Sequence, residues 1–178
     1  MRDGEVARCG NIGISDILKR RGRFRDCILA SLELVKSCDP SRYRRIQRRL
    51  SWITNCPLEA PWQAKYRRSL RACEIDFVEG DYEADPELHV AWCASTIVHE
   101  ATHGVIFGRG IRYTPELRSR IERLCVAEEH RFLDHLAESQ PEMAERLRRD
   151  FDESDWHWSW NAGRTAKLFR TLRRIFSK

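Results

Sequence analysis

The sequence predicts an α+β fold: a mostly helical single domain over residues 1–178, with a small antiparallel sheet packed beside its central helix. Three observations support this prediction. Apolar residues recur at helical spacing over most of the chain, two well-separated segments alternate as strands do, and no repeat or low-complexity linker divides the chain. With 178 residues, 42% apolar and 33% charged, the composition fits one hydrophobic core and excludes fibrous and disordered proteins.

The first predicted helix begins at a cap formed by Ser15 and Asp16 and runs to about Lys36. Apolar side chains within it recur at roughly helical spacing. Gly22 interrupts the pattern in its first third, and the Asp-Pro pair at 39–40 ends it.

Two later segments are expected to be strands. Residues 43–54 fit either a helix or a strand, and a strand is favoured because Trp52, Ile53 and Thr54 have high β propensity. Residues 57–63 form a loop, and residues 73–78 alternate before an acidic turn. Two strands this far apart in a helix-rich chain predict a small sheet beside the helices.

The best-defined helix runs from Asp85, a plausible N-cap, to about Phe107. Pro86 occupies its first position, and a glycine-containing segment at 108–110 ends it. Almost all its faces are apolar or small, so we expect this helix to be buried. Three further helices are predicted over residues 114–136, 140–151 and about 164–176, the last one basic and amphipathic.

The segment VHEATHG within the buried helix contains the residues that point to chemistry. His99 and His103 are four residues apart, share one helix face, and can therefore reach one metal ion. Glu100 lies beside them, where its carboxylate can take a proton from water activated by that metal. Buried in an apolar helix, these three polar groups would lack partners unless they bind something. The pattern predicts a Zn²⁺ site.

The segment STIVHEATHGVIFGRG, residues 95–110, resembles the active-site helix of the zincin metallopeptidases, the HExxH superfamily. The resemblance covers this helix and, more loosely, the order strand, active-site helix, further helix. The metzincin branch would require Gly at position 106 and His at 109, where this chain has Ile106 and Arg109. The resemblance therefore implies a gluzincin-like arrangement, in which a glutamate of the following helix is the third zinc ligand.

Two adjacent residues of that helix are candidates for the third ligand. Glu128 lies near the centre of the apolar face that we expect to point inward, but Arg131 is among its neighbours. Glu129 lies nearer one side of this face, and all its neighbours three and four residues away are apolar, so Glu129 is narrowly preferred. Glu122, one heptad earlier, either supports a ligand or is a solvated carboxylate.

Further roles follow only from the resemblance. Zincins often use a Tyr, His or Arg side chain to stabilise the oxyanion, and Tyr113 could take this role; alternatively, it packs against the next helix. The strand at 73–78 would be the edge strand that pairs with an extended substrate peptide, or it is purely structural.

Charge is distributed unevenly along the chain. Residues 1–73 hold 17 basic and 7 acidic groups, residues 74–155 hold 9 and 20, and residues 156–178 hold 6 and none. The basic blocks could bind nucleic acid or an anionic membrane surface, or they are solvated. The aromatic run at 156–160 is interpreted as an apolar lid over the core or as a ligand platform.

The seven cysteines are dispersed and no Cys-x-x-Cys pair occurs, which is typical of reduced thiols in the cytoplasm. No signal peptide or membrane span is recognisable. The sequence thus predicts a zinc metallopeptidase acting on a peptide or protein, with Glu100 as general base and proton donor and water as nucleophile. Two alternatives remain: an inactive zinc-containing domain whose basic segments bind nucleic acid, membrane or a protein, and, less well supported, a metal-free nucleic-acid-binding protein.

Overall fold

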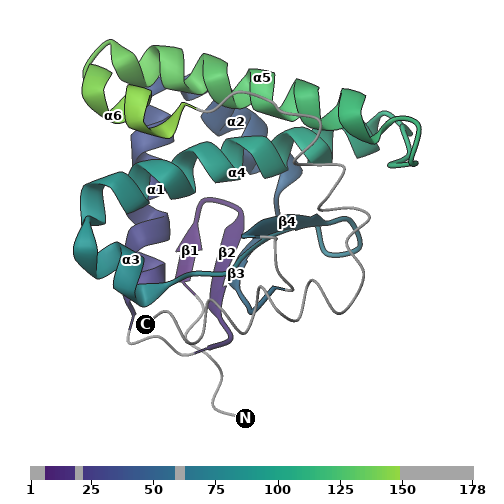
Figure 1. The fold of residues 1–178 in the computed structure, drawn as a ribbon. Helices are drawn as coiled ribbons and strands as arrows, with labels where there is room; N and C mark the ends of the chain where they lie inside the picture. Colours follow the sequence, from purple (N-terminus) through teal and green to yellow (C-terminus); the bar gives the residue numbers. More distant parts are fainter. Residues whose placement is uncertain (1–6, 19–21, 59–62, 149–178) are drawn as a thin grey trace, which may run out of the picture.

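The computed structural model describes residues 7–18, 22–58 and 63–148 (Figure 1). The α+β class predicted from the sequence is confirmed. The expected helix at 164–176 and the aromatic run at 156–160 lie outside the described residues. The elements in chain order are β1 (Ala7–Cys9), β2 (Ile12–Asp16), α1 (Arg23–Cys38), α2 (Pro40–Arg49), β3 (Trp52–Asn55), β4 (Ala64–Arg67), β5 (Ala72–Ile75), α3 (Glu79–Ala84), α4 (Pro86–Gly108), α5 (Arg118–Ala137) and α6 (Pro141–Leu147).

The sheet is larger than expected and mixed. Its strand order is β1-β2-β3-β5-β4, and both outer pairs are antiparallel, as predicted for the whole sheet. The inner pairs β2–β3 and β3–β5 are parallel, so the prediction of a purely antiparallel sheet was wrong. The reason is the connection between β2 and β3: α1 and α2 lie between them in the chain, and a crossover of this length returns the chain parallel to its starting strand.

The first helix begins later than predicted. Ser15 and Asp16 belong to strand β2 rather than to a helix cap, because Ile12 and Ile14 are buried in the sheet core. The Asp16 carboxylate accepts a hydrogen bond from the Asn55 side-chain amide across β2 and β3 at 2.8 Å. Gly22 has φ +78°, a left-handed conformation that glycine tolerates, and α1 begins directly after it.

Residues 43–54 contain both of the structures that their pattern allowed. Helix α2 occupies the first part, and strand β3 the last, so the strand prediction holds only from Trp52 onward. Asp39 starts α2 by accepting a hydrogen bond from the Arg42 backbone N–H at 2.9 Å, with Pro40 at the first helical position. The cap formed by Asp39 and Pro40 therefore makes the first part of this ambiguous segment helical.

Helix α4 has the boundaries that the sequence predicts. The Asp85 side chain accepts a hydrogen bond from the Leu88 N–H at 3.1 Å and Pro86 stands at the start. The helix ends at Gly108, and Gly110 follows with φ +78°. A short helix, α3, precedes it where a turn was expected.

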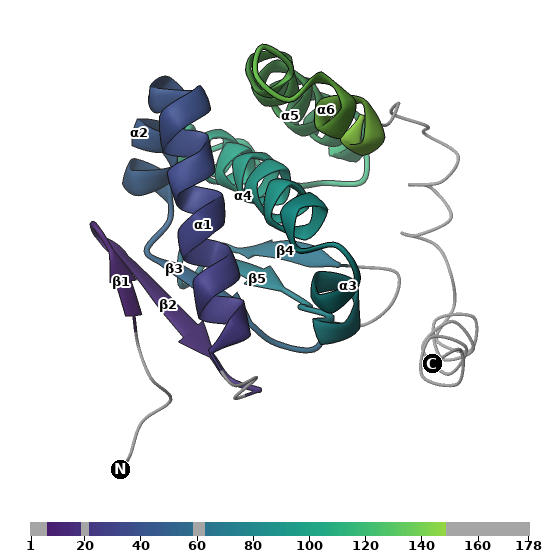
Figure 2. The same cartoon turned by 90° about the vertical axis from the view of Figure 1, so that its left-hand side faces the viewer.

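The elements form three layers with α4 in the middle (Figures 1 and 2). The sheet lies on one side of α1 and α4, and α5 with α6 packs on the other side of α4. This double covering explains why α4 is apolar on nearly every face. None of the helices within the described residues is long and apolar enough to cross a membrane. The core includes Ile12, Ile14, Phe24, Ile28, Leu32, Ile53, Ile75, Phe77, Ile97 and Phe132.

The strand beside α4 at the sheet edge is β4, which the sequence did not predict. β5, which covers part of the predicted strand 73–78, lies inside the sheet between β3 and β4. The suggestion that residues 73–78 are the edge strand was therefore wrong, because both sides of β5 already have paired neighbours. The two edge strands of the sheet are β1 and β4, and β4 is the one that packs beside α4.

Candidate metal centre

His99 and His103 lie on consecutive turns of α4 and face α5. Their ring centroids are 5.2 Å apart, and the residues are 6% and 7% exposed. One oxygen of Glu122, Oε2, lies 3.2 Å from Nε2 of His99 and 3.6 Å from Nε2 of His103. One carboxylate oxygen of the next helix therefore lies close to a ring nitrogen of each histidine.

Glu129 approaches the opposite nitrogen of His99. Its Oε2 lies 3.1 Å from His99 Nδ1, and its Oε1 accepts a hydrogen bond from the Ser95 hydroxyl at 2.7 Å. In this position the carboxylate, which can only accept, favours a proton on His99 Nδ1, and a metal bound at Nε2 would replace the proton there. The structure therefore places the narrowly preferred ligand Glu129 behind the histidine, where it supports the ring.

Glu128, the other predicted ligand, is not brought to the histidines. Its carboxylate is 3.1 Å from the Arg42 guanidinium and also pairs with Arg45 and Arg131. These contacts join α5 to α2, away from His99. The guanidiniums hold the pKa of the Glu128 carboxyl below its usual range, although partial burial acts in the opposite direction.

The buried face of α5 is rotated slightly about the helix axis relative to the apolar face that was predicted to point inward. Leu124, expected to point inward, is 51% exposed, whereas Glu122 and Glu129 are each only 3% exposed. Two glutamates one heptad apart lie on the same face of a helix, because seven residues make nearly two turns. This spacing was the available signal for pairing Glu122 with Glu129, since Cys125 and Val126 continue the same buried face.

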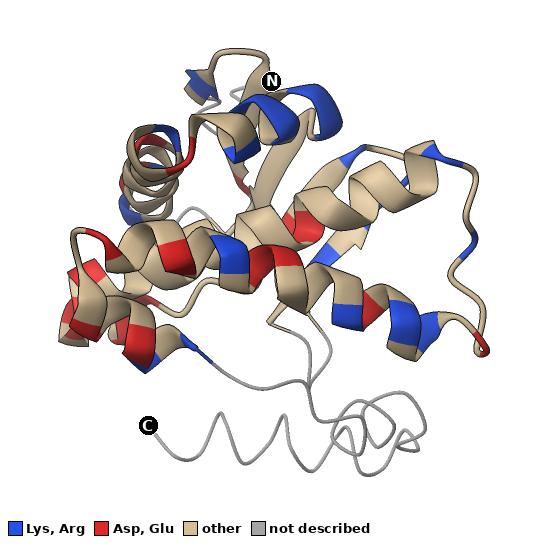
Figure 3. Cartoon of the chain, turned by 90° about the horizontal axis from the view of Figure 1, so that it is seen from above, with Lys and Arg blue, Asp and Glu red and all other residues tan. Residues whose placement is uncertain are grey.

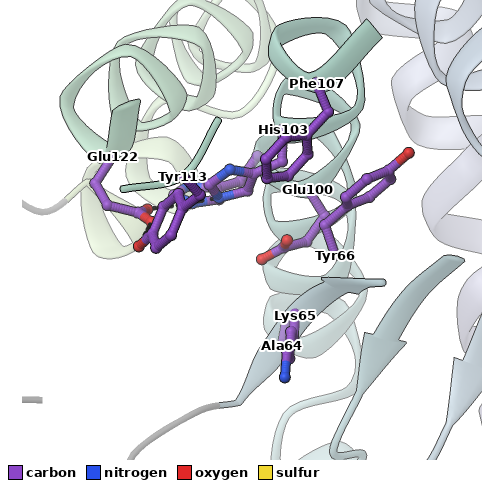
Figure 4. A pocket seen from close by; sticks show the side chains of 9 residues that line it. Ala64, Lys65, Tyr66, Glu100, His103, Phe107, Tyr113 and Glu122 are labelled. Carbon is purple, nitrogen blue, oxygen red and sulfur yellow. Dashed lines mark hydrogen bonds and ion pairs between the residues drawn. The ribbon is translucent and has the colours of Figure 1, made fainter. Parts of the chain in front are cut away.

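Glu100 is buried beside the two histidines and its carboxylate has a free oxygen. Its Oε2 has no hydrogen-bond partner among the residues that the structure describes. Burial raises the pKa of this carboxyl, and the neighbouring histidines only partly offset that effect. Figure 4 shows the carboxylate pointing into the space between α4 and β4. A buried oxygen without a partner is costly unless a ligand or water completes it.

Tyr113 stands on the side of Glu122. Its hydroxyl donates a hydrogen bond to Glu122 Oε1, and its ring centroid lies 6.0 Å from that of His103 (Figure 4). The side chain also packs against the small cluster formed by Ile106, Ile121 and Cys125. Tyr113 therefore packs near the start of α5, as the alternative expectation stated, and its hydroxyl contacts Glu122; a role in stabilising the oxyanion stays a prediction.

These side chains line a cavity of about 350 Å³ between α4, β4 and the start of α5. The sequence did not predict the β4 contribution, because a four-residue edge strand gives little periodic signal. Tyr66 of β4 stacks on Phe107 at 5.7 Å and closes one end of the cavity (Figure 4). The lining residues are Ala64, Lys65, Tyr66, His99, Glu100, His103, Phe107, Tyr113 and Glu122.

The buried carboxylates and imidazoles of this site together favour the binding of a cation. Three carboxylates, those of Glu100, Glu122 and Glu129, surround two imidazoles in a dry environment. Burial would lower the pKa of His99, but hydrogen bonds to Glu122 and Glu129 outweigh it and raise this pKa to about 10. Without a metal, His99 is therefore protonated, and the surrounding carboxylates stabilise its positive charge. A divalent ion could replace this positive charge.

Cys125 is a further potential donor. Its sulfur and one ring nitrogen of each histidine all lie within 4.8 Å of one another. Burial raises the pKa of the Cys125 thiol well above its ordinary value, and nearby glutamates raise it further. The thiol is therefore protonated at neutral pH, whereas Glu122 is ionised because its hydrogen bonds to His103 and His99 outweigh burial and lower its pKa. The nitrogen and oxygen donor set of His99, His103 and Glu122 fits zinc.

Comparison of the chain with protein-family models, with curated proteins and with solved structures finds no match.

Proposed function

We propose that this protein is a zinc-dependent metallohydrolase, and specifically a peptidase, with His99, His103 and Glu122 as the metal ligands. One observation carries the proposal: Glu122 Oε2 lies within 3.6 Å of the Nε2 atoms of both histidines, on the wall of a cavity that Glu100 also faces. Three protein ligands and an open side are typical of catalytic rather than structural zinc sites.

The chain's own groups divide the chemical work. When bound, zinc would act as a Lewis acid and lower the pKa of its coordinated water to about 7. Glu100, with an unpartnered Oε2 at the cavity, takes the proton of the attacking water and later gives it to the leaving amine. Its raised pKa, caused by burial, suits a group that must both accept and release a proton.

Two further residues hold the ligands in place. Glu129, itself fixed by Ser95, keeps His99 in the tautomer with Nε2 unprotonated. The Tyr113 hydroxyl orients Glu122 through its other oxygen. A role for Tyr113 in stabilising the oxyanion would require its hydroxyl to turn from Glu122 toward the substrate.

The substrate is proposed to be a peptide in extended conformation. Strand β4 is the antiparallel edge strand of the sheet, and its residues Ala64, Lys65 and Tyr66 line the cavity. An extended chain could pair with the free edge of β4 and pass Glu100. All seven cysteines are free thiols, which supports a reducing compartment such as the cytoplasm.

The test measures metal and cleavage in the same preparations. We expect zinc at the candidate centre of the purified chain and of Glu100→Gln, whereas the double variant His99→Ala/His103→Ala should bind one equivalent less than the wild-type chain. Incubation with a complex peptide mixture, read by mass spectrometry, should show cleavage by the wild-type chain only. Absence of metal binding on titration would overturn the whole proposal. Metal binding without cleavage of peptides would instead support the alternative of a zinc-containing domain without peptidase activity.

A second candidate function is favoured by one surface feature. Basic residues concentrate on α2 (Figure 3), and the turn between β4 and β5 adds further arginines beside it. Within the described part of the chain, no carboxylate pairs with the five arginines of this cationic cluster. They are Arg44, Arg48, Arg49, Arg68 and Arg71.

Such a cluster could bind nucleic acid or another anionic partner, with or without catalysis. Binding to a labelled oligonucleotide should then weaken steeply with salt, since each phosphate contact releases a counterion. Arg44→Glu/Arg48→Glu should reduce both the affinity and the salt slope. An affinity that does not depend on salt, or is the same in the variant, would exclude this function.

A further inference from the structure

A second group of metal-ligating side chains lies in the core, on the N-terminal half of α4. Cys93 and His89 are four residues apart on α4 and share a face, and Cys27 meets them from α1. Cys93 is six residues from His99, which is about 9 Å along a helix. This group is therefore separate from the candidate centre described above.

The spacing of these donor atoms matches metal coordination. The two sulfur atoms are 3.7 Å apart. Two thiolates bound at the usual 2.3 Å to a tetrahedral zinc ion are about 3.8 Å apart. One ring nitrogen of His89 lies within 4.8 Å of both sulfurs, so all three donors can reach one ion after small side-chain adjustments.

His89 gives an independent indication that a ligand is involved. Its Nε2 is buried and has no hydrogen-bond partner among the residues that the structure describes. The ring is enclosed by aromatic side chains, with centroids at 5.0 Å for Phe77, 5.3 Å for Trp92 and 6.0 Å for Tyr82. Burial lowers the pKa of His89, which keeps the imidazole neutral and able to coordinate. A core built only for packing would not need an imidazole at this position.

A cavity lies beside His89, one of the three donors of this group. It has a volume of about 320 Å³ and lies between α3, α4 and α6. Its lining includes Asp76, Asp81, Asp85 and His89. Arg146 also lines this cavity and pairs with Asp85, but the three aspartates outnumber it, and a net negative lining attracts cations.

We propose that Cys27, His89 and Cys93 form a second site for a thiophilic metal ion, with zinc as the expected occupant. On binding, each thiol forms a bond to the metal and releases its proton to solvent, while the neutral imidazole binds without proton loss. Two thiolates balance the charge of a divalent ion, so the occupied site adds no net charge to the core. The ion would link α1 to α4, two helices whose contact forms much of the central layer.

Cobalt substitution tests this site on the full chain. Metal is first removed by chelation under reducing conditions, and Co²⁺ is then titrated in. Cobalt bound to thiolate gives an intense charge-transfer absorption that nitrogen and oxygen ligands do not give. We expect this band in the wild-type chain and in the triple variant His99→Ala/His103→Ala/Cys125→Ser, which removes the donors of the other centre.

Cys93→Ser should abolish the band and the binding of one metal equivalent. Cys73→Ser is the matched control: Cys73 is equally buried, at 0% exposed, but belongs to β5, and this variant should keep the band. If Cys93→Ser does not fold, His89→Phe provides the second variant, since it leaves both sulfurs and should weaken cobalt binding at least 10-fold. Absence of the band in the wild-type chain, or its persistence in Cys93→Ser, would overturn the proposal.

Discussion

At the scale of single residues, the two buried glutamates of α5 have different positions around one imidazole. Glu122 Oε2 lies at Nε2 of His99, whereas Glu129 Oε2 lies at Nδ1 of the same ring. Because the two nitrogens of a neutral imidazole have opposite hydrogen-bonding roles, in the proposed site Glu122 would share the metal with His99 and Glu129 would fix the tautomer. Two glutamates seven residues apart on one helix would therefore have different roles, because each reaches a different nitrogen of the same ring.

The proposed ligand can be tested against a neighbouring glutamate. Glu122→Gln should lower zinc affinity more than 100-fold, because it removes a charged ligand whose loss exceeds the effect typical of supporting residues. Glu128→Gln is the control, since its carboxylate binds only arginines in the structure and its replacement should leave zinc affinity unchanged. Competition with a zinc chelator measures both affinities. An equal loss in the two variants would contradict the assignment.

The supporting glutamate should give an intermediate effect. Glu129→Gln keeps the shape of the side chain but weakens the hydrogen bond to His99 Nδ1, so zinc affinity should fall about 10- to 100-fold. Ser95→Ala should lower it less, because Ser95 contacts only Glu129. The same chelator competition measures this series. If Glu129→Gln lost zinc as completely as Glu122→Gln, Glu129 would be a ligand itself.

At the scale of elements, close approach of α4 to its neighbours depends on glycine after the second histidine. A Cβ built at Gly104 would lie 3.2 Å from the Arg49 Cβ and 3.3 Å from the Tyr66 ring. These contacts are tighter than ordinary van der Waals separation, so α2 and β4 would have to move. The absence of a side chain at this position thus lets β4 reach the cavity.

Two glycines on helices give a matched comparison. Gly104→Ala should destabilise the fold by about 1 kcal/mol, because overpacking of 1–3 kcal/mol exceeds the gain in helix propensity. Gly80 in α3 has open space where a Cβ would be, so Gly80→Ala should stabilise by about 0.5–1 kcal/mol. Chemical denaturation measures both free energies of unfolding. Equal effects at the two positions would refute the close approach at Gly104.

The junction of α1 and α2 depends on the charge of Asp39. Burial raises the pKa of this carboxyl, but hydrogen bonds from the Arg42 backbone and side chain outweigh it, and the net pKa is lowered. Since the folded pKa lies below the unfolded value, the stabilisation is complete above the unfolded pKa. It is lost as pH falls through the folded pKa.

Asp39→Asn separates the charge of this residue from its capping function. Asparagine also caps helices, so the variant should lose only the charge, at about 1–2 kcal/mol near neutral pH. The difference from the wild-type chain should disappear on acidification below the folded pKa. Urea denaturation over a pH series measures this. A difference that stays constant to low pH would mean that the charge of Asp39 does not matter.

At the scale of the whole molecule, the layered arrangement places buried charge in the middle of the fold. Helix α4 lies between the sheet and α5, and the two histidines meet Glu122 and Glu129 at the contact with α5. A metal at this contact would bind the folded chain and not the separated helices. Metal binding and stability should therefore be coupled.

Removal of metal should lower the melting temperature of the entire chain. Free zinc at 100 times its dissociation constant stabilises the folded state by about 2.7 kcal/mol, and chelation removes this contribution. The double variant His99→Ala/His103→Ala should lose the part of the chelator response that belongs to the candidate centre. Calorimetry with and without chelator measures the shifts. Identical melting in both conditions for the wild-type chain would contradict a folded-state metal.

The sequence by itself determined the local features of this protein. The α+β class, the limits of α4 and the shared face of His99 and His103 follow from capping residues and from spacing, which depend on near neighbours. It also marked α4 as buried, because few polar residues interrupt it. These features could be predicted since their energetics are contained within one or two helical turns.

Only the tertiary structure decided which distant groups meet. Parallel pairing in the sheet, the edge position of β4 and the proximity of Glu122, rather than Glu128, to the histidines depend on how elements pack. A rotation of α5 by a fraction of a turn exposes Leu124 and buries Glu122, and no local pattern fixes that angle. The motif on α4 could be recognised in the chain, but its partners come from packing between layers.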